Sequence, residues 1–166
     1  MVFLHNSRQI QETNQFKNNW YAETASFPKM RTFIKFKTSF KMESYLLSIK
    51  NHKLRKLFSR FRLSNHDLEI ERSHYHKPAI PADQRICQHC NSLSVEDEEH
   101  VIMQCKAYEN PRSIFMSNVS EINSDICNEG FVSIISTSDP RNIFYICKFL
   151  EKIFYYRKTH HSKVSI

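Results

Sequence analysis

Apolar residues recur at helical spacing along much of the chain. The clearest short example lies at residues 54–63, where four of them follow the i, i+3, i+4, i+7 pattern: Leu54, Leu57, Phe58 and Phe61. This spacing puts the apolar side chains on one face of a helix. Four basic residues fall elsewhere on the same helical wheel: Arg55, Lys56, Arg60 and Arg62. The pattern predicts a helix that packs on one side and is cationic on the other.

Two longer apolar stripes follow in the last third of the chain, each behind a helix start signal. Asn110-Pro111 resembles a helix cap and first residue, and Gly130 a C-terminal stop. The stripe between them is Phe115, Val119, Ile122 and Ile126. Asp139-Pro140 repeats the start signal before a third stripe, made of Ile143, Ile146, Cys147, Leu150, Ile153 and Phe154. These signals predict two helices near the C-terminus.

The first part of the chain gives weaker patterns. Residues 9–26 carry sparse apolar positions and predict a helix that ends before Pro28. RTFIKFKTSF alternates apolar residues with Lys and fits either a strand or the start of a helix. We therefore predict a mostly α fold, a small helical domain with an embedded zinc knuckle. Its four segments are an N-terminal helical arm (1–28), a basic helical segment (29–84), the zinc knuckle (85–112) and C-terminal helices (113–166).

The knuckle is predicted from three of the five cysteines and one histidine, which fall in CQHCNSLSVEDEEHVIMQC, residues 87–105. Their spacing is C-x2-C-x9-H-x4-C, and a C-x2-C step aims two thiolates at one point about 2.3 Å from a zinc ion. The predicted cofactor is zinc, with ligand atoms within about 4 Å of one another. The ligands are Cys87, Cys90, His100 and Cys105. Four protein ligands leave no place for water, so the predicted site is structural and the protein is not an enzyme.

The acidic run between these ligands predicts how the histidine is presented. Ser94 with Asp97 three residues later resembles a capping box, and acidic side chains favour a helix N-terminus. His100 would then lie in an early turn of a helix that continues towards Cys105. Residues five apart on a regular α-helix point about 140° away from each other. We therefore expect the helix to loosen between these two ligands.

Charge and composition reduce the number of functions that fit this chain. A single glycine excludes glycine-rich phosphate loops, which need several. Residues 29–77 hold 13 Lys/Arg against 4 Asp/Glu, a local charge of +9. The net charge of the whole chain is +7, so the remaining residues together carry about −2. Such a block suits a polyanion, although a solvated basic helix face would look the same. Five cysteines, no secretory signal and no long apolar run predict an intracellular chain, nuclear or cytoplasmic, without a membrane span.

Two stretches resemble a known family: RFRLSNHDLEIERSHYH and RICQHCNSLSVEDEEHVIMQCKAYENPR. They are similar to the C-terminal Cys/His region of non-LTR (LINE-type) retrotransposon reverse transcriptases, and the likeness covers roughly residues 12–112. It implies the same four zinc ligands and a role in holding template RNA or target DNA. Further landmarks match at Arg85, Glu96-Asp97, Tyr108 and Arg112. The polymerase's pair of adjacent aspartates is absent from this chain.

The leading hypothesis is thus a non-catalytic, zinc-stabilised module, a retrotransposon remnant that binds RNA or DNA. Its backbone contacts would be sequence-independent and made by Arg55, Lys56, Arg60 and Arg62. Four aromatic residues among the cations could stack on bases or belong to the core: Phe33, Phe36, Phe40 and Tyr75. The alternative is a zinc-stapled protein-interaction module, in which the acidic run Glu96–Glu99 and the helical stripes meet a protein partner.

A zinc deaminase is a third and weaker hypothesis. Its signature requires His-x-Glu and then Pro-Cys-x-x-Cys. Here the stretch from His66 to Glu69 has one residue too many, and Ile86 precedes the first cysteine. The remaining cysteines, Cys127 and Cys147, are expected to be core or incidental thiols.

Overall fold

Helices form most of the computed structural model, which describes residues 2–161. Within that range no β-strand occurs, and the predicted mostly α fold with a Cys/His cluster is confirmed. The longer helices are α1 (Val2–Ser26), α4 (His52–Arg62), α6 (Glu109–Ile122) and α9 (Pro140–His161). The shorter ones are α2 (Phe33–Phe36), α3 (Tyr45–Ser48), α5 (Glu69–Arg72), α7 (Ser124–Asn128) and α8 (Phe131–Ser136). Among these helices, none has both the length and the apolar character that crossing a bilayer requires.

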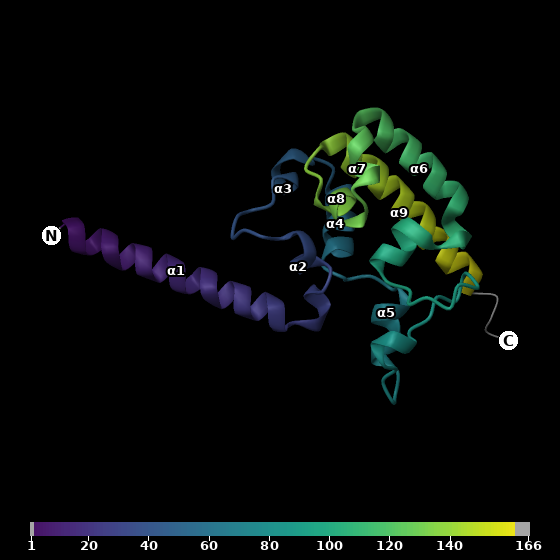
Figure 1. Ribbon diagram of the computed structural model, residues 1–166, viewed down its shortest axis with the longest axis horizontal. Coiled ribbons are helices and arrows are strands. Elements are labelled where there is room, and N and C mark those ends of the chain that lie inside the picture. The colour runs from purple at the N-terminus through teal and green to yellow at the C-terminus, as the bar shows by residue number, and fades with distance from the viewer. Residues whose placement is uncertain (1, 162–166) are drawn as a thin grey trace.

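The N-terminal helix α1 extends away from the other helices (Figure 1). It ends at Ser26, and Phe27 and Pro28 lead into a 3-10 turn, η1 (Pro28–Met30). The predicted N-terminal helix is therefore present. RTFIKFKTSF, whose pattern left strand and helix open, contains the single helical turn α2.

The core is built around α9, which packs against α4 and α6. Its predicted apolar stripe is confirmed, because Ile143, Ile146, Leu150 and Ile153 are fully buried. Each such side chain contributes roughly 1.5–3 kcal/mol by leaving water. Phe149 extends the contact to α6 by stacking on Phe115, with ring centroids 5.0 Å apart.

The second predicted stripe is divided between two helices. Helix α6 begins at Glu109, before Asn110-Pro111, and ends at Ile122. The break occurs because the Asn123 side chain accepts a hydrogen bond from the Asp125 backbone N–H, which caps the new helix α7. Gly130 follows α7 with a φ of 87°, a left-handed conformation that suits glycine. The predicted stop is thus in place, but it ends a shorter helix.

Helix α4 is capped by Asn51, whose side chain accepts hydrogen bonds from two backbone N–H groups. Phe58 and Phe61 are fully buried, as the stripe predicts. The prediction that Arg62 belongs to the cationic face is wrong. Arg62 is 2% exposed, and its guanidinium lies 4.0 Å from the centre of the Phe36 ring and pairs with the Glu43 carboxylate at 2.6 Å.

We expect Arg62→Ala to lower the free energy of unfolding by about 2–3 kcal/mol, because it removes a buried charge pair and a cation–π contact. The matched change Arg60→Ala, on the exposed side of the same helix, should cost no more than about 0.5 kcal/mol. Chemical denaturation of both variants measures the difference. Equal stabilities would show that Arg62 has no structural role.

Candidate metal centre

A short hairpin positions the first ligand of the cluster. Ile86 and Val95 form an antiparallel bridge. Next to it the Cys87 backbone N–H donates to the Ser94 carbonyl at 2.9 Å. Leu93, with a φ of 55°, adopts the left-handed conformation in the turn. These contacts hold the Cys87–Cys90 loop against the start of the next helix.

The second ligand pair lies on a widened helical turn. Residues His100–Gln104 form a π-helix, η4, in which the Cys105 backbone N–H donates to the His100 carbonyl at 2.8 Å. This i to i+5 bonding brings residues five apart closer to one face than an α-helix would. The predicted loosening is confirmed. Asp97, rather than Ser94, supplies the cap, since its Oδ1 accepts from the His100 N–H at 2.8 Å.

The four predicted ligand atoms converge on one point. All of them lie within 4.8 Å of one another, somewhat wider than the 4 Å expected from the sequence. Cys87 Sγ and Cys105 Sγ are 3.8 Å apart, and Cys90 Sγ is 3.4 Å from His100 Nε2. In a zinc tetrahedron with ordinary bond lengths, the S···S and S···N edges measure about 3.8 and 3.5 Å. The cluster can therefore hold one metal ion.

Burial makes this a closed site. Cys87, His100 and Cys105 are almost completely buried, and Cys90 is half-buried. Three sulfurs and one imidazole nitrogen form a donor set typical of structural zinc, with every coordination position taken by protein. The arrangement can bind and stabilise, but it offers no open position for a reacting water.

The ligand groups perturb one another's protonation. The hydrogen bond with Cys105, together with burial, raises the pKa of Cys87, and the same hydrogen bond lowers the pKa of Cys105. Burial lowers the pKa of His100, but the sulfurs of Cys87 and Cys90 outweigh this and raise it to about 9. Metal binding requires deprotonated ligands. A metal entering this cluster would displace protons that the ligands otherwise share.

Two arginines connect the cluster to the helices around it. Arg157 of α9 is 1% exposed and pairs with the fully buried carboxylate of Glu96. Glu96 Oε1 also lies 3.5 Å from Cys87 Sγ. Arg112 of α6 donates to the Ile102 carbonyl at 2.8 Å and to that of Cys105. The Cys/His cluster is therefore tied to α6 and α9.

The rest of the acidic run is also used inside the molecule. Glu98 is 1% exposed and pairs with Arg31 at 3.0 Å and with His66 Nε2 at 2.8 Å. Burial raises the pKa of Glu98, but the hydrogen bond from His66 and the charge of Arg31 outweigh it and bring the pKa to about 2. Glu99 pairs with Lys35 at 3.1 Å. Glu96 and Glu98 thus serve the chain's own contacts and are closed to a protein partner, whereas the Glu99 side chain is 43% exposed.

The residues predicted to bind phosphate fall into two groups. Arg62 is buried, and Arg55 is half-buried, with its guanidinium donating to the carbonyls of Leu46 and Ile49 at 3.2 Å. Lys56 and Arg60 are exposed and line a groove between α4 and α9.

Two cations of this groove were missing from the sequence prediction, Lys53 of α4 and Lys158 of α9. Lys53 precedes Lys56 by three residues and Arg60 by seven, a helical spacing that the sequence does contain. Lys158 lies about a hundred residues away along the chain, so only the packing of α9 on α4 reveals it.

The four aromatic residues considered for base stacking also differ in exposure. Phe33 and Phe36 are half-buried, and Phe36 lies under Arg62. Phe40 and Tyr75 are exposed, with Tyr75 close to the Lys29 ammonium. Phe33 contacts both Phe36 and Trp20, and Trp20 contacts Phe40, so these three belong to one aromatic cluster that has no contact with Tyr75 among those described.

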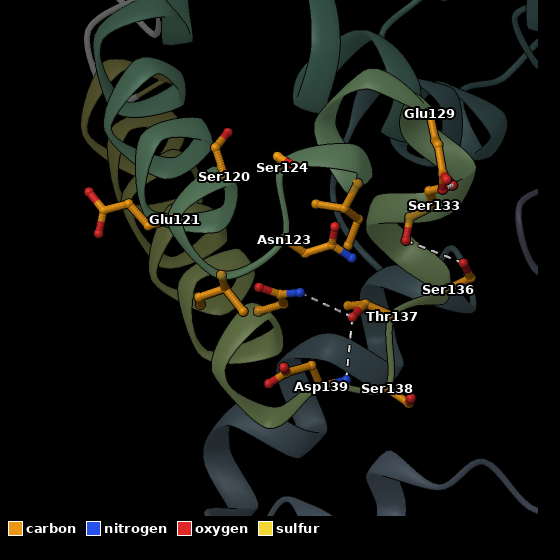
Figure 2. A pocket seen from close by; sticks show the side chains of 13 residues that line it. Ser120, Glu121, Asn123, Ser124, Glu129, Ser133, Ser136, Thr137, Ser138 and Asp139 are labelled. Atoms are coloured by element: carbon orange, nitrogen blue, oxygen red, sulfur yellow. Dashed lines mark hydrogen bonds between the residues drawn. The ribbon is translucent and has the colours of Figure 1, made fainter.

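A separate hollow of about 770 Å³ lies away from the Cys/His cluster, between α6, α7, α8 and the start of α9. Figure 2 shows its serine hydroxyls, with Thr137 accepting from Asn142 and from the Asp139 backbone. Its lining residues include neither histidine nor cysteine, and one lining hydroxyl, that of Ser133, donates to the Glu129 carboxylate at 2.7 Å.

The remaining histidine and cysteine predictions have clear outcomes. His66, which the deaminase signature would need, contacts Glu98 rather than the ligand cluster. Cys147 is fully buried and is a core thiol, as expected. The side chain of Cys127 lies outside the described residues.

Comparisons with protein-family models, curated proteins and solved structures found no match to this chain. The function proposed below therefore rests on the site itself.

We expect Cys105→Ser to destabilise the protein far more than Cys147→Ser. Losing a ligand removes much of the metal's folding energy, on the order of several kcal/mol. Serine at position 147 adds one buried hydroxyl, at about 1–3 kcal/mol, and can keep the contact that Cys147 Sγ makes to the Leu54 carbonyl at 3.4 Å. Thermal melting of both variants measures the contrast. Equal melting shifts would argue against a structural metal.

Proposed function

We propose that this chain is a non-catalytic, zinc-stabilised module that binds the backbone of RNA or DNA, inside the cell, in the nucleus or cytoplasm. The observation that carries the proposal is the buried convergence of three cysteine sulfurs and one imidazole nitrogen. Among common metals, zinc favours this soft donor set in tetrahedral geometry. The closed ligand set supports a structural rather than a catalytic metal.

The cationic side of α4 supports a polyanion as ligand. Lys53, Lys56 and Arg60 are exposed and share one side of the helix, at the same groove as Lys158. Such cations bind phosphates through a salt-sensitive and sequence-independent interaction. These four residues replace the set predicted from the sequence, in which Arg55 and Arg62 are engaged in internal contacts.

The proposed origin, the C-terminal region of a retrotransposon reverse transcriptase, rests on the resemblance of residues 12–112. The landmark residues of that resemblance have structural roles around the cluster. Arg112 donates hydrogen bonds to the carbonyls of Ile102 and Cys105, and the Glu96 carboxylate contacts Cys87 Sγ.

A protein-interaction module is the second candidate, favoured by exposed apolar side chains. Phe16 on the projecting helix α1 is 69% exposed, Met42 67% and Leu47 71%. A protein partner could cover these residues while zinc stabilises the fold.

The electrostatic proposal is tested with Lys53→Gln, Lys56→Gln and Arg60→Gln combined. Oligonucleotide binding should weaken equally for every sequence, and the slope of log K against log salt should fall by up to about 2–3 units. The matched control is Arg141→Gln, Lys148→Gln and Lys152→Gln, which lowers the net charge equally at exposed sites away from the groove. Fluorescence anisotropy at several salt concentrations measures both variants. If both triple variants bind oligonucleotides as tightly as wild type at low salt, the protein-interaction module becomes the favoured function.

A further inference from the structure

The groove between α4 and α9 combines charge with an apolar lining. Its volume is about 580 Å³, which falls within the range of ordinary small-ligand sites. Leu57 and Phe61 of α4 and Phe154 of α9 form its apolar part. Leu57 and Phe154 are half-buried, so part of each remains accessible from the groove.

Cationic residues from both helices line this groove. Lys53, Lys56 and Arg60 lie on α4 and span about 10 Å at 1.5 Å rise per residue, while Lys158 comes from α9. Arg60 is held in place because its Nε donates to the Asn65 carbonyl at 3.1 Å. Asp67 is the one acidic residue among the lining residues described, so the field inside the groove is positive.

A phosphate backbone alone would use the cations and leave the apolar lining in water. The lining instead suits an apolar group, because Leu57 and Phe154 remain partly accessible beside the cations. The Phe154 ring lies roughly parallel to the His66 ring, at 6.5 Å between centroids and 29° between planes. A ligand that fits both features carries a flat aromatic body next to negative charge. An unpaired nucleotide has this chemistry, whereas a duplex keeps its bases stacked inside.

We propose that this groove binds single-stranded nucleic acid, with one unstacked base against Phe154 and the flanking phosphates on the four cations. The proposal rests on the proposed function and adds the strand preference and the position of the base. Stacking on an aromatic side chain tolerates every base, so the groove selects single strands without selecting sequence.

The first test changes the nucleic acid and leaves the protein intact. Fluorescence anisotropy at low salt compares three oligonucleotides of equal length: a single strand, its duplex, and a single strand with abasic sites in the middle. Abasic sites keep the phosphates but remove the bases. The intact single strand should bind at least about fivefold more tightly than either of the others.

The second test places the base at Phe154. Phe154→Leu keeps an apolar side chain but removes the ring, and should weaken single-strand binding by about fivefold or more with little change for the duplex. Tyr155→Leu is the matched control, since Tyr155 is 71% exposed and does not line the groove. In wild-type protein, a photoreactive 5-bromouracil strand should cross-link to residues of the groove, which gives a readout that does not depend on the variant's folding.

The outcomes separate this inference from the proposed function. If duplex and abasic strands bind as tightly as the intact single strand, or cross-links map outside the groove, the base-binding site is overturned while backbone binding stands. If none of the three oligonucleotides binds, the nucleic-acid function itself fails.

Discussion

The convergence of four ligand atoms on one point is the constraint on which the rest of the structure depends. Residues 85–108 contain one isolated bridge, a π-turn and a 3-10 turn, so regular hydrogen bonding alone gives this segment little stability. Its buried thiols are close enough for one metal ion to join them. We infer that zinc supplies the missing folding energy, as in other small structural sites.

Buried ion pairs connect this segment to the rest of the chain. Glu96 pairs with Arg157 of α9, and Glu98 pairs with Arg31, which also contacts Glu71. Breaking such a pair leaves an uncompensated buried charge, so each one fixes which segments meet. These pairs join the Cys/His cluster to the helical core. Helix α9, which pairs with Glu96 through Arg157, also forms one side of the cationic groove.

The sequence predicts this structure where a pattern is local. The ligand spacing, the need for a loosened turn before Cys105 and the stripe of α9 are all readable from residues close together in the chain. Prediction failed where partners are distant. Arg62 looks like a surface cation until Glu43 and Phe36 are seen to enclose it, and Lys158 joins the groove only through helix packing. The division into four segments stays a prediction.

Native mass spectrometry of the purified protein tests the central claim most directly, because it reports metal identity and stoichiometry on the folded chain. We predict one zinc ion per chain, lost on chelation together with the compact charge-state distribution. Folded protein that carries no zinc, and keeps the same charge states after chelation, would contradict a structural zinc site at Cys87, Cys90, His100 and Cys105.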